Sequence, residues 1–583
     1  MTWPPGTPGQ DAASLRADLA AQGGWTPVLE RFGLAVWRHG SHGPPATLLP
    51  RGGVLVGELF DRAATEAGEV APYDPRRLAD EDWLVVARRV VREAWGRYVL
   101  VLPVSGRAPV IIRDPLGAID ALAWRRGDVH LVGDLVPRGL AAPPDLALDL
   151  PRLSALIGEP DLATDDPPLT GLVAVRPGTA TDDQGRRHVL WTPGPFARRD
   201  DLTREAASDA IPRVTRACIA ALTSGRERIL GEVSGGLDSA IVATTLSALG
   251  QRPARGVHFY WPQAEADERP YAKAVAKAAG IGLDLIARPI EPIDPAAFEA
   301  VAHAPRPSFN AVDPLYDARL AERLVAHQAQ ALITGQGGDV VFFQMPAPQL
   351  ALDIAWRGPR RRGLSALSRR TQRSVWSLLA AGLGRPERMT FPFAVGAAPP
   401  PPHPWLTDLA GVGAAKRIQI EGLIANQASL ALSRRGSVAD LLHPLLSQPL
   451  VELCLRTPAA ILAGGEQDRA FTRGLFQGQL PQAVFRRQAK GDLSVYFAKS
   501  VSLSLPAWRP YLLEGELARL GLIDVDRLDA AMTPETMIWR DGSAEILSLM
   551  VLETWTRHWQ GRIADGRRDL NSAPADPGAR AGS

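Results

Sequence analysis

Between residues 25 and 190, short runs of β-branched and aromatic residues recur, and most of them end at Gly, Pro or Asp. Runs of this kind predict β-strands. A helical pattern of apolar positions lies among them over residues 76–95. Strands and helices mixed in this way predict a layered α+β domain, which we assign to residues 1–195.

The pattern changes after residues 191–201, a stretch with Pro and Gly that we interpret as a linker. Beyond it, apolar runs alternate with amphipathic helical segments, which predicts an α/β domain with a doubly wound parallel sheet over residues 200–562. The expected strands cover residues 226–233, 254–261, 283–290 and 331–334. Residues 345–430 are arginine-rich with a mostly helical pattern, and the small polar residues of 563–583 predict a disordered tail.

The composition is that of an ordinary globular protein, since 46% of the 583 residues are hydrophobic, 22% are charged, and the net charge is +2. A balance this close to neutral gives no reason to expect a nucleic-acid or membrane partner. Cys218 and Cys454 lie in apolar surroundings and form no disulfide or metal-binding pattern. The N-terminus lacks the pattern of a signal peptide, and no run approaches the ~20 apolar residues of a membrane span. We therefore expect a cytoplasmic protein.

The sequence Ser-Gly-Gly-Leu-Asp-Ser at residues 234–239 follows a predicted strand and opens a predicted helix. Gly235 and Gly236 let a ligand approach the backbone, and the free N–H groups at the helix start favour an anion. Ser234 and Ser239 add hydroxyl donors, so a phosphate chain is the expected ligand. Asp238 would repel phosphates unless a cation lies between them, as Mg²⁺ does. The alternative for this loop is a simple helix cap, which uses the same residue types.

A second loop, Gly335-Gln336-Gly337-Gly338-Asp339, follows the strand expected at 331–334. Parallel sheets bind ligands at the carboxyl ends of their strands, so we expect Asp339 to supply a second Mg²⁺ ligand beside Asp238. Other phosphate-binding and nucleophile motifs do not fit. The first loop has no lysine for a P-loop, and Glu232 stands where a nucleophile elbow needs glycine.

Together, the two loops resemble the ATP-pyrophosphatase synthetase domain of the asparagine-synthetase superfamily. The resemblance implies that the substrate ATP transfers AMP to a carboxylate, which an amine then attacks to form an amide. It assigns pyrophosphate binding to Ser234, Gly235, Gly236 and Ser239, and Mg²⁺ binding to Asp238 and Asp339. It adds Leu237, Val257, Gly335, Gln336 and Gly337 to the residues that bind the nucleotide.

Residues 480–494 resemble a late loop of the same family, in which a lysine precedes a glycine. Lys490, followed by Gly491, matches that position. The implied role of Lys490 is catalytic, because a fixed cation stabilises the charge that develops on the phosphate and on the attacking amine. The alternative is an ordinary solvated lysine. Arg486 and Arg487 are weaker candidates for phosphate contact.

Residues 96–135 resemble the core of the glutaminase half of this superfamily, which has an N-terminal-nucleophile (Ntn) fold. That half needs an N-terminal cysteine as its nucleophile, whereas this chain has Thr2 followed by Trp3 and two prolines. Because the first strand is expected only near residue 25, we do not expect the N-terminus to lie in a sheet. We predict a glutaminase-like domain that is inactive and produces no ammonia.

Without ammonia, the amine must come from the substrate, as in the ring-closing members of the superfamily. These are the β-lactam-type synthetases and the lasso-peptide cyclases. Gln336 stands where β-lactam synthetases carry a tyrosine, which favours the cyclases. Four further segments resemble the cyclases, namely residues 403–406, 414–423, 443–458 and 464–476.

A lasso-peptide cyclase adenylates an Asp or Glu side chain of a processed precursor peptide, and the new α-amino group of that peptide closes a macrolactam with release of AMP and pyrophosphate. The implied partners are the precursor peptide and a leader peptidase or leader-binding protein. The arginine-rich residues 357–388 either line a peptide groove or form a solvated face. The alternatives for the whole chain are an ammonia-dependent asparagine synthetase, a β-lactam-type synthetase and an inactive scaffold.

Overall fold

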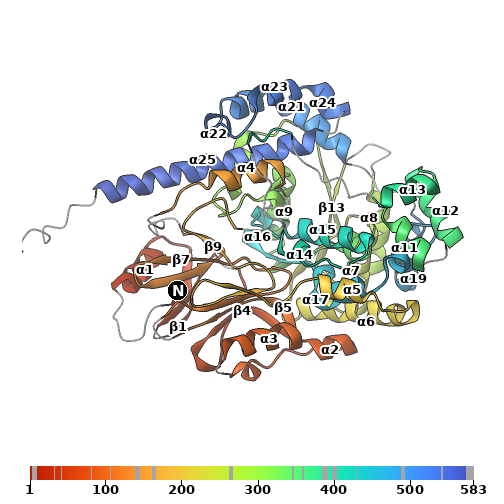
Figure 1. Cartoon of the computed structure of the whole chain (residues 1–583), viewed down its shortest axis with the longest axis horizontal. Coiled ribbons are helices and arrows are strands. Elements are labelled where there is room, and N and C mark those ends of the chain that lie inside the picture. Colours follow the sequence, from red (N-terminus) through yellow and green to blue (C-terminus); the bar gives the residue numbers. More distant parts are fainter. Residues whose placement is uncertain are drawn as a thin grey trace, which may run out of the picture.

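The structure is a computed structural model in which two sheet-containing halves pack together with helices between and around them (Figure 1). It describes residues 1–2, 10–31, 33–40, 42–80, 82–104, 107–137, 143, 145–160, 166–261, 267–344, 347–357, 360–383, 392–396, 403–428, 430–487, 493–539 and 542–572. Within these ranges, every helix is either too short or too polar to traverse a lipid bilayer.

Two antiparallel sheets face each other in the N-terminal half. One has the strand order β11-β10-β6-β5-β4-β3, and the other joins the pair β1-β2 to the three strands β8-β7-β9 through bridges of Thr2 to Leu34 and His130. The first sheet consists of β3 (Ala46–Leu48), β4 (Val54–Asp61), β5 (Ala94–Leu102), β6 (Val110–Arg113), β10 (Thr179–Thr181) and β11 (Arg187–Val189). The second consists of β1 (Trp25–Arg31), β2 (Leu34–His39), β7 (Leu122–Arg126), β8 (Val129–Gly133) and β9 (Val173–Ala174).

Alternation along the strands gives each sheet two apolar faces. Val99 and Val101 of β5 lie between the sheets, whereas Leu100 points to the outer face. That outer face is covered by α3 (Trp83–Glu93), next to α2 (Arg62–Ala67). The other sheet is covered by α1 (Gln10–Ala21) and lies close to α4 (Leu150–Gly158). The resulting order of layers is helix, sheet, sheet, helix, which agrees with the predicted layered α+β half.

The N-terminus lies inside the second sheet, so the prediction that it stands outside any sheet is wrong. Thr2 forms bridges to both Leu34 and His130, and its N–H donates to the carbonyl of His130 at 2.8 Å. The ammonium of Met1 donates to the carbonyl of Ala35, and burial lowers its pKa to about 5. A segment this short has no alternation pattern of its own, which is why the sequence did not reveal it.

The C-terminal half contains the parallel sheet that the sequence predicts, with strand order β14-β13-β12-β15-β16. Each pairing in this sheet is parallel. Its strands are β12 (Ile229–Glu232), β13 (Arg255–Tyr260), β14 (Leu283–Ala287), β15 (Ala331–Ile333) and β16 (Asp440–Leu442). The first four match the four expected strands, and β16 adds an edge strand that was not predicted.

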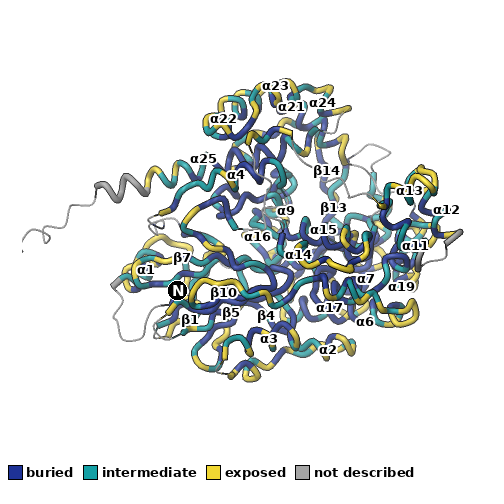
Figure 2. The backbone as a smooth tube through the Cα atoms, in the orientation of Figure 1, coloured by how far each residue is buried: buried dark blue, intermediate teal, exposed yellow. Residues whose placement is uncertain are grey.

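Helices cover both faces of the parallel sheet, and Figure 2 shows the chain buried or half-buried along β13. One face packs against α6 (Arg204–Thr223), α7 (Leu237–Ala248) and α8 (Arg269–Ala279). The opposite face packs against α9 (Pro314–Ala326), with α16 (Arg434–Val438) beside it. Helices on both faces define a doubly wound α/β arrangement.

The remaining helices follow the second loop and the last strand. Around the arginine-rich segment lie α10 (Gly338–Val341), α11 (Leu350–Arg357), α12 (Arg360–Thr371), α13 (Val375–Gly382), α14 (Pro404–Thr407) and α15 (Ala414–Ala428). After β16 come α17 (Gln448–Arg456), α18 (Ala459–Leu462), α19 (Ala470–Leu475), α20 (Gln482–Arg486), α21 (Ser494–Leu513), α22 (Glu516–Arg519), α23 (Val525–Ala531), α24 (Pro534–Trp539) and α25 (Ser543–Ser572).

Two predicted boundaries are corrected by the structure. The expected linker at 191–201 contains α5 (Gly194–Arg199), and the indole N–H of Trp191 donates to the buried carboxylate of Glu452 at 2.7 Å. The segment is therefore packed onto the second half. At the other end, α25 is helical through Ser572, so the predicted tail does not begin at 563. Several residues there favour helix, among them Ala and Arg, and the helix start is anchored in the core. Residues 573–583 lie outside the described residues.

Lys416 on α15 is a buried cation in the second half, with 1% of its surface exposed. Its Nζ donates to Oε1 of Gln419 at 2.9 Å and to the carbonyl of Cys454 at 2.8 Å. Burial lowers the pKa of Lys416 to about 7, against a partial opposing effect of Cys454 and Asp353. Burial likewise raises the pKa of Asp353 to about 6, despite the nearby lysine.

The Lys416 pKa predicts a pH-dependent stability. Its folded-state value lies below the unfolded value of 10.5, so between about pH 7 and 10.5 the unfolded chain binds more protons. Stability therefore rises with pH in this window. When the pH is raised from 6 to 9, the free energy of unfolding of the wild type should increase by about 2–3 kcal/mol more than that of Lys416→Met. Denaturant unfolding at the two pH values measures this, with Lys277→Met on the exposed side of α8 as control. Equal pH slopes in the wild type and Lys416→Met would contradict the prediction.

Candidate functional site

The first loop joins the end of β12 to the start of α7 by a tight turn. Gly235 has a φ of +79°, in the left-handed region that favours glycine. A Cβ at Gly235 would also lie 2.8 Å from the Cβ of Tyr271, so the turn is packed against α8. Gly236 caps α7 without a side-chain hydrogen bond to the helix. The first-turn N–H groups of α7 therefore point out of the helix start, toward the space beyond the strand end.

The two serines of the first loop brace it. The hydroxyls of Ser234 and Ser239 lie 3.0 Å apart, and the N–H of Gly236 donates to Ser234 Oγ at 3.2 Å. Ser239 Oγ also donates to the carbonyl of Gly236 at 3.3 Å. Of the other two predicted nucleotide-binding residues near this loop, Leu237 and Val257 have buried side chains. The carbonyl of Val257 accepts the N–H of Val233, so both residues support the loop from the core side.

The second loop lies directly against the first, because β15 is the neighbour of β12 in the sheet. A Cβ at Gly335 would lie 2.4 Å from the backbone N of Ser239. A Cβ at Gly338 would lie 2.5 Å from Oδ1 of Asp238. The carboxylate of Asp238 thus touches the residue that precedes Asp339. Asp339 is exposed in the first turn of α10, so both predicted metal ligands stand at the same edge of the sheet.

Arg469 provides a cation at Asp238. Its Nη1 donates to both carboxylate oxygens of Asp238, at 2.6 and 2.9 Å, and its Nε donates to Asp468 at 3.1 Å. The Arg469 side chain is 4% exposed. Burial alone would lower the pKa of Arg469, but the charges of Asp238 and Asp468 raise it overall. The position beside Asp238 is therefore one where the chain itself places positive charge.

A second arginine from the same late part of the chain reaches the first loop. Arg487 Nη1 donates to the carbonyl of Gly235 at 3.0 Å, and its guanidinium lies 4.3 Å above the ring of Tyr271. Arg487 also pairs with Glu268. Arg487 was predicted as a weak candidate for phosphate contact, and here it binds the backbone of the first loop. Lys490, the predicted catalytic residue, and Gly491 lie outside the described residues.

Glu232 at the end of β12 carries a polar network beside the loop. The hydroxyl of Tyr316 on α9 donates to Glu232 Oε1 at 2.7 Å. Burial, together with Glu232, raises the pKa of Tyr316 well above its usual value, so its phenol keeps its proton. The guanidinium of Arg435 lies 5.3 Å from the Tyr316 ring and pairs with buried Asp317 at 2.8 Å. This network fixes the strand end from which the first loop departs.

His443 supports the second loop from beneath. Its Nδ1 lies 2.8 Å from Thr334 Oγ1, which accepts the N–H of Gln336 at 3.1 Å. Burial, with the positive charges of Arg435 and Arg97, lowers the pKa of His443 to about 3, so its ring is neutral. Gln336 is therefore held through its backbone, and its half-buried side chain belongs to the site edge.

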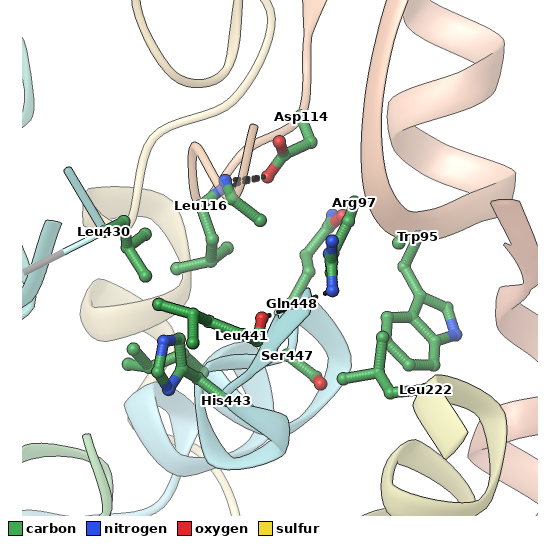
Figure 3. Close-up of a pocket in the computed structure, with 13 residues that line it drawn as sticks. Trp95, Arg97, Asp114, Leu116, Leu222, Leu430, Leu441, His443, Ser447 and Gln448 are labelled. Carbon is green, nitrogen blue, oxygen red and sulfur yellow. Dashed lines mark hydrogen bonds between the residues drawn. The ribbon is translucent and has the colours of Figure 1, made fainter. Parts of the chain in front are cut away.

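A cavity of about 60 Å³ lies behind His443, between β5 of the first half and the end of β16 (Figure 3). Its wall includes Trp95, Arg97, Asp114 and Gln448. Among the described residues, Nε2 of His443, Oδ2 of Asp114 and Oε1 of Gln448 have no hydrogen-bond partner. Such polar atoms fit buried water. Its lining residues come from both halves, so the cavity is a feature of the interface between them.

The chain matches the family model of asparagine synthase over residues 212–557, which is more than half of its 583 residues. The chain belongs to the asparagine synthase family. The matched region contains the whole parallel sheet and both loops. No individual curated protein matches the chain. Asparagine synthases use ATP, typically with Mg²⁺, to form amide bonds, so this asparagine synthase family member is an ATP-dependent amide-forming ligase.

The residues of this asparagine synthase family member fit a bound Mg²⁺–nucleotide. Asp238 already accepts a cationic group, and three glycine positions, at 235, 335 and 338, leave no room for a Cβ. Mg²⁺ usually takes one or two protein carboxylates and completes its shell with phosphate oxygens and water. Asp238 and Asp339 would hold it. Accordingly, the described residues contain no group of three or more His, Cys, Asp or Glu side chains arranged as a protein-only metal site.

Arg469, Thr334 and His443 support this site and were not predicted from the sequence. Arg469 and His443 lie in the segments 464–476 and 443–458, which resemble the cyclases. A signal was present in Arg469, since it follows Gly464, Gly465 and two acidic residues in a segment that must turn. Its φ of +50° confirms a turn there. Thr334 and His443 carry no local signal, because their contact joins positions 109 residues apart.

Because the two loops are in close contact at Gly335, the addition of one methyl group there should disturb the site. Gly335→Ala should force the loops apart, at about 1–3 kcal/mol of unfolding free energy, and lower the affinity for Mg²⁺-ATP. Gly474→Ala on α19, where a Cβ meets nothing within 4 Å, is the matched control and should bind as the wild type does. Calorimetric titration with Mg²⁺ and a non-hydrolysable ATP analogue measures the difference. Wild-type affinity in folded Gly335→Ala would refute the steric account.

Proposed function

We propose that this ligase is a lasso-peptide cyclase. It activates an Asp or Glu side chain of a processed precursor peptide as an acyl-adenylate, releasing pyrophosphate, and the α-amino group of the same peptide displaces AMP to form a macrolactam. The observation that carries the ATP chemistry is the contact of Asp238 with Gly338, which places two carboxylates at one strand edge. The proposal that the substrate is a peptide rests on Gln336 and on the four segments between residues 403 and 476 that resemble lasso-peptide cyclases.

The residues of the chain have distinct tasks in this proposal. The α7 N-terminus and the hydroxyls of Ser234 and Ser239 bind the β- and γ-phosphates, because N–H groups at a helix start attract anions. Asp238 and Asp339 would hold Mg²⁺, which would neutralise phosphate charge when bound. Arg469, which pairs with Asp238, adds a fixed positive charge beside this carboxylate.

Lys490 is assigned the catalytic role in the amide-forming step. A cation near the acyl-adenylate favours the charge that develops on the α-phosphate as AMP leaves. Arg487, the last described residue before it, donates to the carbonyl of Gly235 in the first loop. Holding the amine beside the activated carboxyl supplies much of the rate enhancement.

We propose that the N-terminal half is an inactive glutaminase-like domain of the Ntn type. The helix–sheet–sheet–helix layering supports this assignment. The residue at position 2 is Thr2, which is buried between two strands, and the Met1 ammonium is buried with it. A nucleophile needs access to its substrate, so a buried threonine in the middle of a sheet supports the absence of ammonia production. The domains proposed are residues 1–195 and, extended to the end of α25, residues 200–572.

The proposed partners follow from the reaction. The substrate must reach the enzyme with a free α-amino group, so a peptidase that removes a leader, or a protein that presents the leader, acts before the cyclase. Both steps suit the cytoplasm, where ATP is available. The arginine-rich segment includes exposed Arg362 and Arg369 on α12, which supports a solvated face there.

The proposal predicts a specific product. The full-length protein with ATP, Mg²⁺ and a leaderless peptide should yield a peptide lighter by one water, with one AMP formed for each ring. Mass spectrometry of the peptide and quantitation of AMP measure this. A product that gains an ammonia-derived amide without a ring would favour an asparagine synthetase. Activity on a small β-amino acid alone would favour a β-lactam-type synthetase, and absence of ATP–pyrophosphate exchange would favour a scaffold.

The role of Lys490 gives a second prediction. Lys490→Ala should lower kcat by about 10²–10³-fold, as loss of a group that stabilises transition-state charge does. The affinity for Mg²⁺-ATP should change much less. Single-turnover assays of AMP release measure the rate, and Lys277→Ala on the exposed side of α8 is the control. If Lys490→Ala kept the wild-type rate, the lysine would be a surface residue with no part in the reaction.

A further inference from the structure

The carboxylate of Asp339 is carried by α10, a helix of only one turn. A helix this short is not stable by itself, so its position depends on contacts from elsewhere. At its start, Gly337 and Gly338 lie against Leu446 and Leu445, and a Cβ at either glycine would come within 3 Å of these leucines. The start of α10 is therefore fixed by close packing.

The end of α10 is fixed by a side chain from another helix. Nε2 of Gln419 on α15 donates to the carbonyl of Val340 at 3.2 Å and to that of Val341 at 3.0 Å. The chain turns away after α10, and Phe343 has a φ of +57°, in the left-handed region. The carbonyls at a helix end need partners when they are buried. Gln419 supplies them from a position 78 residues farther along the chain.

Gln419 is itself held in one orientation. Lys416, one turn earlier on α15, donates from Nζ to Gln419 Oε1 at 2.9 Å and to the carbonyl of Cys454 at 2.8 Å. Because an amide has one acceptor and one donor end, this contact directs the donor end of Gln419 at α10. Gly422 completes the contact, since a Cβ there would lie 3.0 Å from both methyl groups of Val340. Helix α15 thus lies directly on α10.

We propose that Gln419, oriented by Lys416, is the positioning residue that sets the place of Asp339 in the Mg²⁺ site. It acts through the backbone of α10 and touches neither the nucleotide nor the metal. The inference rests on the proposed function only in taking Asp339 as a Mg²⁺ ligand. Groups that orient metal ligands typically change metal affinity by 10–100-fold when they are removed.

Gln419→Met tests this inference, because methionine keeps the length of the side chain and removes its donor and acceptor. The half-saturating Mg²⁺ concentration for binding a non-hydrolysable ATP analogue should rise about tenfold. Binding of the analogue in EDTA should stay at the wild-type level. Gln427→Met is the matched control, since Gln427 is a buried glutamine on the same helix that donates to Leu116 and not to α10. It should leave the Mg²⁺ requirement unchanged.

A readout that needs no activity separates this inference from the proposed function. Hydrogen exchange of the peptide spanning residues 334–344 should be faster in Gln419→Met than in the wild type, and unchanged in Gln427→Met. If the wild type showed no Mg²⁺-dependent nucleotide binding, the proposed function would fail, while faster exchange would still support the positioning of the loop. Wild-type exchange and a wild-type Mg²⁺ requirement in Gln419→Met would overturn the inference.

Lys416→Met is the second variant, should Gln419→Met fail to fold. It keeps Gln419 and removes the amine that orients it. The Mg²⁺ requirement should move in the same direction by a smaller factor, because the amide of Gln419 can still reach α10 in one of its two orientations. An unchanged Mg²⁺ requirement in Lys416→Met, together with unchanged exchange over residues 334–344, would also overturn the inference.

Discussion

The backbone of Gly335 lies so close to the backbone of Asp238 and Ser239 that a single methyl group would not fit between them. This contact between two loops is the constraint on which the site depends. It requires that β12 and β15 be neighbours and parallel, so that both loops leave the sheet at the same edge. It also requires glycine at 335 and 338. Given both, Asp238 and Asp339 lie on loops that leave the same edge of the sheet.

Side chains from other segments of the chain hold the two loops in this contact. His443 and Thr334 support the second loop from the sheet, Gln419 holds the end of α10, and Arg487 grips the carbonyl of Gly235. These supports come from segments between residues 334 and 487, whereas the first loop ends at 239. Thr334, Gln419 and Arg487 are buried, so they form their hydrogen bonds in surroundings where a lost partner is costly. A shallow, water-exposed site would not need them.

The sequence was sufficient for those parts of the molecule that are encoded locally. The loop at 234–239 and the loop at 335–339 each follow a short apolar run, and strand–helix alternation correctly gave a parallel sheet with four of its five strands. The fifth strand, β16, has only three residues, and it does not lie within the alternation of strands and helices that predicted the other four. The expected disordered tail was wrong at its start, because α25 is helical through Ser572.

The contacts that the sequence did not reveal join distant positions. Arg469 and Asp238 are 231 residues apart, and nothing in either segment states that they pair. The prediction that Thr2 lies outside any sheet failed for a different reason. The two residues that enter the sheet are too few to show an alternation of apolar and polar positions. Lys416 is a different case: a lysine within a helical pattern is ordinarily placed at the surface, and only the carbonyl of Cys454 and the amide of Gln419 explain its burial.

The carboxylate of Glu452 fastens the two halves to each other. It accepts from Trp191 of the connecting segment, from Gln448 of its own helix, and from Arg62 on α2 of the first half. A gene that lost its first two hundred codons would leave this anion in an apolar setting with two of its three donors gone. The second half therefore depends on the first for the partners of a buried charge, and removal of the first half should destabilise the second.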